Sequence, residues 1–113
     1  MDINIQIMKA LSDETRLKMI DMLLHHDYCV GALAYHIGLS EASISQHLKV
    51  LRKAGLVRGE KRGYYTHYEI NIPLIEEAAG ALMSMVHDQP ERQGCKLELT
   101  GNADECRVLC KKR

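Results

Sequence analysis

The chain has 113 residues, with 15 Lys and Arg against 15 Asp and Glu, so its formal net charge is zero. Apolar residues make up 46% and charged residues 27%, a balance typical of one globular domain rather than a disordered tail. A uniformly basic nucleic-acid binder is excluded, but a locally basic one is not. Since the sequence has no apolar run near the ~18 residues of a membrane span and no charged leader, we expect a cytoplasmic protein without membrane contacts.

The charge is concentrated in the middle of the chain. Residues 40–70 carry six basic and three acidic side chains, residues 1–39 carry three and five, and residues 71–113 carry six and seven. The net charges are therefore +3 for the middle segment and −2 and −1 for its flanks. A basic segment between acidic flanks indicates a contact with a polyanion.

The first half of the chain predicts a series of helices. A short Ile-rich helix is expected from Ile3 to Leu11, and Ser12 is expected to cap a second, stronger helix. Apolar residues then repeat at helical spacing over residues 30–37. Ser40 is expected to cap a further helix that runs to Ala54.

The periodicity changes after residue 55. Residues 56–60 and 64–70 are rich in β-branched or aromatic side chains, and Lys61-Arg62-Gly63 separates them, which predicts a β-hairpin with a basic tip. A last long helix is expected to begin at residues 71–73. Its apolar stripe comprises Ile75, Ala78, Ala79, Leu82 and Val86.

Together these elements predict a mainly α fold with a β-hairpin wing. Two short helices joined by Gly38-Leu39-Ser40 and followed by a hairpin are typical of a winged helix-turn-helix. We expect residues 1–88 to form this DNA-binding and dimerisation domain. The composition turns polar beyond it, so residues 89–113 are expected to form a cysteine-containing tail.

The helix capped by Ser40 has two distinct faces. At ~100° per residue, Ile44, Leu48 and Leu51 lie within ~60° of one another and form a stripe to be buried. The opposite face is small and polar near its start and basic further along, so it can approach base edges and engage phosphates. The residues expected to contact DNA are Ser40, Ala42, Ser43, Ser45, Gln46, His47, Lys49, Lys53, Lys61, Arg62 and Tyr64.

Two other interpretations of these residues are weaker. A solvated helix face and a charged turn are common features, but their order and spacing here favour DNA binding. A catalytic Ser–His pair has no support, since no Asp or oxyanion-type glycine turn accompanies Ser45 or His47, and we expect no enzyme. For His47 we expect a structural or phosphate-facing hydrogen bond. Four further histidines have no partner residue at the spacing of a metal site, and we expect them at the surface. They are His25, His26, His36 and His67.

Several motifs in one order resemble a known family. They are Leu11-Ser12-Asp13-Glu14-Thr15-Arg16-Leu17, Leu39-Ser40, the segment from Ser45 to Arg52, and Ala54-Gly55-Leu56-Val57. Over about residues 3–87 the chain is similar to the ArsR/SmtB family of metal- and thiol-responsive repressors. The resemblance implies a cytosolic homodimer that binds an operator and is released by an inducer. It also implies that the first and last helices form the dimer interface.

The inducer sites implied by the resemblance are mostly missing. One family site has Cys-Val-Cys where this chain has Cys29-Val30-Gly31, so half of that chelate is absent. A second site uses Asp and His on the last helix. The matching residues here are Ile72, Leu74, Met85 and Asp88, of which three cannot bind zinc. The pair of cysteines used by the family's redox sensors, on the second and last helices, is also absent.

Four cysteines remain as candidate ligands. Asn102 to Glu105 reads as a capping box, so Cys106 and Cys110 are expected on one face of a short tail helix, too far apart for a disulfide but able to hold a soft ion. Cys95 could be a third ligand, and Cys29 from either subunit could join or replace it. Three thiolates suit As(III), and four suit Cd(II) or Zn(II).

The sequence therefore predicts a dimeric DNA-binding repressor released from its operator by a thiophilic metal or metalloid ion. A first alternative keeps the fold and makes the cysteines a redox switch. A second alternative is a metal-buffering or protein-interaction module that binds no operator.

Overall fold

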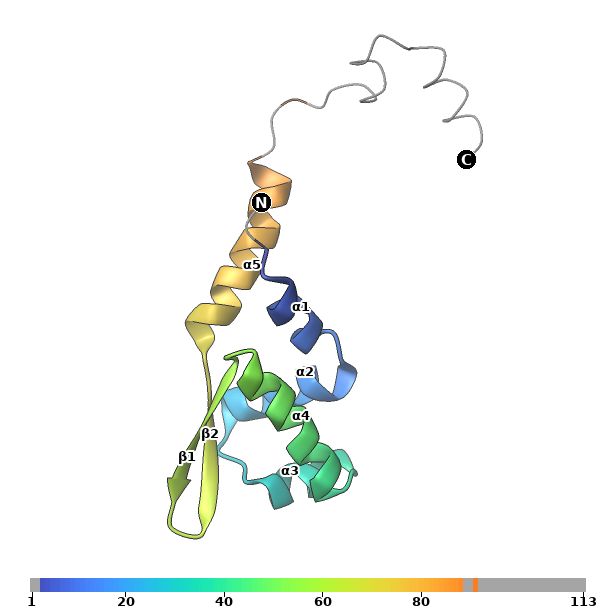
Figure 1. Cartoon of the computed structure of the whole chain (residues 1–113), viewed down its shortest axis with the longest axis vertical. Helices are drawn as coiled ribbons and strands as arrows, with labels where there is room; N and C mark the ends of the chain where they lie inside the picture. Colours follow the sequence, from blue (N-terminus) through green and yellow to red (C-terminus); the bar gives the residue numbers. More distant parts are fainter. Residues whose placement is uncertain (1–2, 89–90, 92–113) are drawn as a thin grey trace, which may run out of the picture.

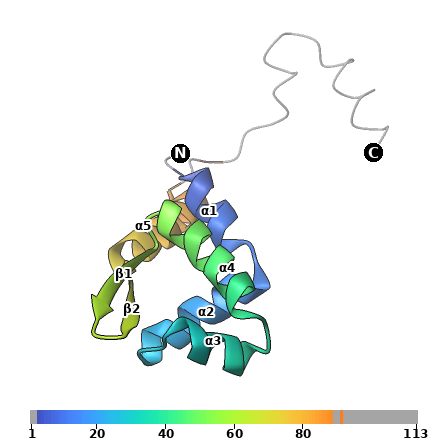
Figure 2. The same cartoon turned by 60° about the horizontal axis from the view of Figure 1, so that its bottom comes forward.

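The computed structural model describes residues 3–88 and 91. The elements are α1 (Ile5–Leu11), α2 (Glu14–His25), α3 (Val30–Ile37), α4 (Glu41–Lys53), β1 (Val57–Arg62), β2 (Tyr65–Ile70) and α5 (Ile72–His87). The hairpin lies on one side of α4 and α1 on the other, and both views show this arrangement (Figures 1 and 2). The mainly α fold with one antiparallel hairpin is as predicted.

The predicted cap of the second helix is wrong by one residue. Asp13, not Ser12, is the N-cap of α2, and its carboxylate accepts the backbone N–H of Arg16 at 2.9 Å. Ser12 instead ends α1, where its hydroxyl donates to the carbonyl of Met8 at 2.7 Å. Both residue types can cap a helix, so the tight connection between α1 and α2 decided which one does.

Residues 38–40 connect α3 to α4, and Ser40 caps α4 as predicted. Gly38 adopts the left-handed conformation, with φ of +83°, and its N–H donates to the carbonyl of Ala34 at 2.8 Å. The Ser40 hydroxyl then accepts the N–H of Ser43 at 3.1 Å and starts α4. These two bonds fix the angle at which α4 leaves the turn.

One apolar core holds α4 against the other elements. Met19, Leu33, Ile44, Leu51 and Leu56 are each 0% exposed. They come from α2, α3, α4 and the segment just before β1, so the core joins the helices to the base of the hairpin. Burial of such side chains contributes about 1.5–3 kcal/mol each and makes α4 a fixed element.

The hairpin turns later than predicted. Lys61 pairs with Thr66 and Arg62 with Tyr65, so both basic residues belong to β1. The turn is at Gly63, with φ of +62°, and at Tyr64, because only the glycine tolerates the left-handed conformation without strain.

Asn71 joins the end of the hairpin to the end of α4. Its side-chain amide donates to the carbonyl of Gly55 at 3.1 Å, and its side-chain oxygen accepts the N–H of Leu74 at 3.3 Å as the cap of α5. Helix α5 then leads away from α4 (Figure 1). None of the helices in the described part of the chain combines the length and apolar character needed to cross a membrane.

Candidate nucleic-acid interface

Helix α4 has the two faces that its sequence predicts. Ile44, Leu48 and Leu51 are 0%, 2% and 0% exposed and point into the core. The exposed residues of α4 that were expected to contact DNA are Ala42, Ser45, Gln46, Lys49 and Lys53. Ser40 is also exposed, whereas Ser43 is half-buried. The helix therefore presents small polar side chains near its start and lysines near its end.

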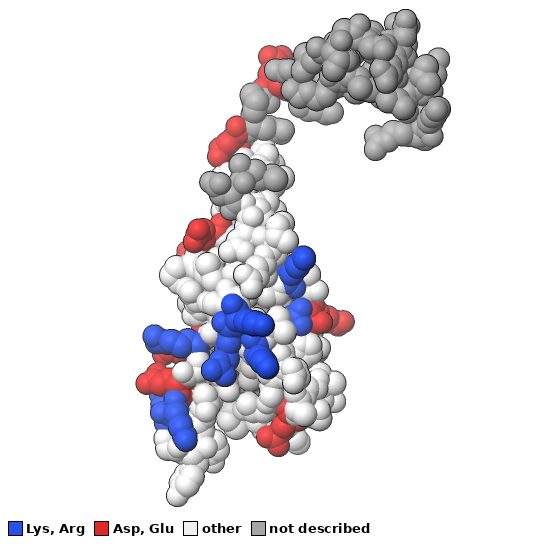
Figure 3. Space-filling view, viewed as in Figure 1, with Lys and Arg blue, Asp and Glu red and all other residues white. Residues whose placement is uncertain are grey.

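Lys and Arg side chains gather over α4, and others lie over the hairpin and α1 on the same face of the molecule (Figure 3). Within the described residues, Lys49 and Lys53 form no ion pair. Their ammonium groups are thus available to an external anion. Lysine side chains on the outer face of such a helix are typical contacts to DNA phosphates.

The basic residues of the hairpin differ from those of α4. Arg62 lies 3.4 Å from a carboxylate oxygen of Glu60 and 4.0 Å from those of Asp27 and Glu69. Arg58 donates to Glu69 at 2.6 Å. These arginines are therefore engaged by carboxylates of the same chain, which the sequence prediction for Arg62 did not foresee.

Lys61 and Tyr64 are the accessible members of the hairpin set. Lys61 is exposed and, among the described residues, without an ion pair, and Tyr64 is 98% exposed at the turn. An aromatic ring at the tip of a hairpin can lie against a sugar or a groove wall, and its hydroxyl can donate to phosphate.

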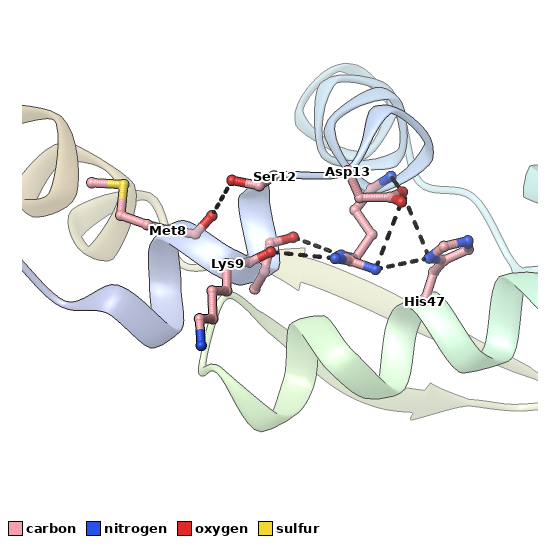
Figure 4. A network of polar contacts seen from close by, with 7 residues as sticks. Met8, Lys9, Ser12, Asp13 and His47 are labelled. Carbon is pink, nitrogen blue, oxygen red and sulfur yellow. Dashed lines mark hydrogen bonds and ion pairs between the residues drawn. The ribbon is translucent and has the colours of Figure 1, made fainter. Parts of the chain in front are cut away.

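His47 is half-buried and contacts polar side chains at the start of α2. Its Nδ1 lies 3.2 Å from a guanidinium nitrogen of Arg16 and 3.8 Å from a carboxylate oxygen of Asp13 (Figure 4). Arg16 also donates to the carbonyls of Ala10 at 2.6 Å and Lys9 at 3.3 Å. Of the two expected roles, this geometry supports the structural one.

Arg16 and Asp13 are the site residues that sequence reasoning missed. They join three elements, because Arg16 binds the last turn of α1 and the middle of α4 from its place on α2. The spacing of an N-cap acid and an arginine three residues later was visible, but the contact of Arg16 with His47 spans 31 residues. The backbone hydrogen bond from Arg16 is the main cause that lowers the pKa of Asp13 below its ordinary value of 3.8.

The histidines expected at the surface do not all lie there. His25, His26 and His36 are exposed, but His67 on β2 is half-buried. The buried Nδ1 of His67 has no hydrogen-bond partner among the described residues and lies 3.7 Å from a carboxylate oxygen of Asp27. The folding of the hairpin against the α2–α3 connection covers this side chain.

Cys29 is the N-cap residue of α3 and is half-buried with a free thiol. It lines a hollow of ≈ 290 Å³ together with Glu41 at the start of α4 and Tyr65 of the hairpin. Within the described part of the chain, no three His, Cys, Asp or Glu side chains lie close enough to hold a metal ion. The other candidate ligands, Cys95, Cys106 and Cys110, and the expected tail helix lie outside the described residues.

Comparison with known proteins agrees with this fold. Residues 13–58 match the family model described as "Bacterial regulatory protein, arsR family". The chain is 35% identical over 103 aligned positions to the HTH-type transcriptional regulator CmtR of Mycobacterium tuberculosis, covering 83% of this chain and 87% of that protein. It is 38% identical over 68 residues to the arsenical resistance operon repressor of Escherichia coli, covering 59% of this chain and 58% of that protein.

A solved structure of an ArsR-like regulator has a similar fold. An ArsR-like transcriptional regulator from Rhodococcus sp. RHA1 superposes with a TM-score of 0.66 at 29% identity, over 74% of this chain and 78% of that one. These relatives are regulators rather than enzymes, and the exposed α4 and hairpin are the parts that a winged helix-turn-helix presents to DNA. The chain is a member of the ArsR family of transcriptional regulators.

Proposed function

We propose that this regulator is a cytoplasmic homodimeric repressor that a thiophilic metal or metalloid ion releases from its operator. The DNA-binding part of this proposal rests on the outer face of α4, where Ser45 and Gln46 precede Lys49 and Lys53, two exposed lysines without an ion pair to any described residue. A helix with short polar side chains at its start can enter the major groove, and lysines near its end can engage phosphates.

The roles follow from the position of each side chain. Ser45 and Gln46 would bond base edges, and Ala42 would allow close approach of the helix. Lys49 and Lys53 would engage phosphates, as would Lys61 beside the exposed ring of Tyr64. Ser40 and Ser43 hold the start of α4 through their capping bond. Arg62 would need to exchange a carboxylate for a phosphate.

Residues 1–88 would form the DNA-binding and dimerisation domain. Apolar side chains that remain exposed on α1 and α5, including Ile5 at 58%, Leu82 at 47% and Met85 at 46%, support this proposal. A small domain gains stability by covering such residues with a second copy.

The cysteines would supply the ligands of the inducer. Sulfur donors select soft ions such as As(III), Cd(II) or Zn(II), and one relative is named for arsenical resistance. The alignment with CmtR covers 83% of the 113 residues, about 94, which cannot fit within residues 1–88. The candidate ligands in residues 89–113 are Cys95, Cys106 and Cys110, with Cys29 as a further candidate, and their support is the sulfur chemistry of their side chains.

The DNA-binding proposal is tested with the full chain and a duplex from upstream of its own gene. Footprinting locates the protected sequence, and fluorescence anisotropy compares Lys49→Gln with a Ser45→Ala/Gln46→Ala double variant. We expect Lys49→Gln to weaken binding to all sequences and to make the salt dependence less steep. The double variant should instead lose discrimination between sequences, by about 1–3 kcal/mol for a lost base contact. Absence of binding at low salt would favour the interaction or buffering module.

The inducer proposal is tested on the same complex with arsenite, Cd(II), Zn(II) and peroxide. We expect one of the ions to release the duplex from the wild-type protein and a Cys106→Ser/Cys110→Ser variant to remain bound. Cys29→Ser shows whether the thiol near α4 takes part. Release by peroxide alone, with oxidised thiols in the mass spectrum, would replace the metal proposal by the redox switch.

A further inference from the structure

The groove between α1 and α4 contains one of the proposed DNA contacts, Lys53, together with residues of α1 and α2 to which no DNA contact has been assigned. It has a volume of ≈ 230 Å³ and is lined by Gln6, Lys9, Ala10, Arg16, Val50, Lys53 and Ala54. Its floor is apolar, and its charged lining residues are all basic. The hollow at the base of the hairpin contains Glu69 and the hollow beside Cys29 contains Glu41, so both of those carry a carboxylate.

Two lysines from different helices flank this groove. Lys9 lies in the last turn of α1 and Lys53 at the end of α4, and both are exposed. Within residues 3–88 and 91 neither forms an ion pair. A pair of unpaired ammonium groups across a groove without carboxylates attracts an anion.

Arg16 forms part of the wall and fixes Lys9 in place. Its guanidinium contacts the carbonyls of Ala10 and Lys9 and the ring of His47, and its Nη1 lies 4.0 Å from a carboxylate oxygen of Asp13, so its charge is already partly balanced. Because Arg16 binds the carbonyl of Lys9 itself, the turn that carries Lys9 is held against α4. A preorganised contact costs less conformational entropy on binding.

The groove also lies where a DNA strand would pass. Lys and Arg side chains over α1 share one face of the molecule with those over α4 (Figure 3). In two views α1 lies on the opposite side of α4 from the hairpin (Figures 1 and 2). If α4 enters the major groove, the hairpin would reach the DNA backbone on one side of α4, and the residues of α1 would lie toward the backbone on the other side.

We infer that the α1–α4 groove is a phosphate site for the operator backbone, with Lys9 as a DNA contact outside the helix-turn-helix and hairpin. This inference rests on the proposed function, because it assumes that α4 enters the major groove. The proposed ligand of the groove is the sugar–phosphate backbone of DNA. If the groove instead bound an acidic protein segment, replacing Lys9 would not change DNA binding.

The test compares full-length wild type, Lys9→Gln, Lys9→Arg and Lys49→Gln on the footprinted duplex, at a series of salt concentrations. With two copies per dimer, Lys9→Gln should make the slope of log K against log salt less negative by about 1.8, since each phosphate contact contributes about 0.9. Lys9→Arg keeps the charge and should retain the wild-type slope. Thermal unfolding of each variant checks that the fold is intact.

Single methylphosphonates placed along each strand then locate the contact. One uncharged position per half-site should weaken wild type and Lys49→Gln several-fold but leave Lys9→Gln unchanged. If Lys49→Gln loses affinity while Lys9→Gln keeps the wild-type slope and methylphosphonate profile, the groove is no phosphate site and the proposed function stands. If wild type binds no duplex, both the inference and the proposed function are overturned.

Discussion

Arg16 is the residue through which α1, α2 and α4 contact one another. Its side chain is 16% exposed and bonds the carbonyls of Ala10 and Lys9 as well as His47. Hydrogen bonds from a charged group contribute about 1.5–3 kcal/mol each, and carbonyls that lose a partner on burial add a penalty. This one side chain therefore links the proposed dimerisation helix to the proposed recognition helix.

Replacing Arg16 should reduce the stability of the fold. We expect Arg16→Met to lower the free energy of unfolding by about 2–3 kcal/mol, because two carbonyls and His47 lose their donor. Arg16→Lys keeps the charge but cannot reach all three acceptors, so its loss should be smaller. Urea unfolding measures both, with Lys18→Met, an exposed position on the same helix, as control. Equal stability of Arg16→Met and the control would contradict this role.

The lowered pKa of Asp13 predicts a dependence of stability on pH. A carboxyl whose pKa is lower in the folded state stabilises that state at pH values above its unfolded pKa, and this contribution disappears as pH falls through the folded pKa. Asp13→Asn keeps an N-cap group but cannot ionise. We expect it to be less stable than wild type at pH 7, with the difference shrinking below about pH 4. Urea unfolding at several pH values measures this, and a constant difference down to pH 3 would contradict it.

At the scale of elements, the α3–α4 turn and α5 offer a matched pair of glycines. A Cβ on Gly38 or Gly80 would meet no atom within 4 Å, so only the backbone conformation distinguishes them. Gly38 has φ of +83°, whereas Gly80 lies in the middle of α5. We expect Gly38→Ala to destabilise the protein by about 1–2 kcal/mol and Gly80→Ala to stabilise it by about 0.5–1 kcal/mol. Opposite shifts in chemical unfolding would support this assignment, and shifts of the same sign would not.

The hairpin and α4 divide the basic residues into two kinds. Arg58 and Arg62 are paired with carboxylates of the hairpin and of the α2–α3 connection, whereas Lys49 and Lys53 of α4 form no ion pair with the residues that the structure describes. The ion pairs of Arg62 reach from the hairpin to Asp27, so they orient the wing relative to the helices. Exposed ion pairs of this kind contribute little to the free energy of unfolding, so we expect their main effect to be on the orientation of the hairpin.

For the whole molecule, the exposed apolar stripe of α5 predicts association. At ~100° per residue Leu82 lies within ~40° of the buried Ala78, while His87 lies on the opposite side of the helix. We expect Leu82→Glu to weaken the dimer by a factor on the order of 100 or more, because burying an unpaired carboxylate costs several kcal/mol. His87→Glu adds the same charge on the polar side and should leave the dimer intact. Sedimentation velocity measures both, and a wild-type monomer at micromolar concentration would reject the proposal.

Local features of the sequence were sufficient for most of the fold. The stripe Ile44–Leu51, the Gly38 turn, the Ser40 cap and the residues opposite the stripe were all predicted, because periodicity and capping depend on a few neighbouring residues. The choice between Ser12 and Asp13 as a cap, and between Arg62 and Gly63 as the hairpin turn, was missed by one or two residues. At both places, neighbouring residues in the sequence can each take the same role, so local propensity does not decide between them.

Periodicity, capping residues and turn residues in the sequence were sufficient to predict a winged helix-turn-helix with a basic segment over residues 40–70 and an apolar stripe on its last helix. Which basic and histidine side chains have a partner within the described residues depends on the tertiary structure. Arg62 is engaged by Asp27, His47 by Arg16, and the Nδ1 of His67 is covered, whereas Lys9 and Lys53 flank an open groove. The reason is physical: burial and ion pairing depend on which distant segments the apolar core brings together, and no local pattern contains that information.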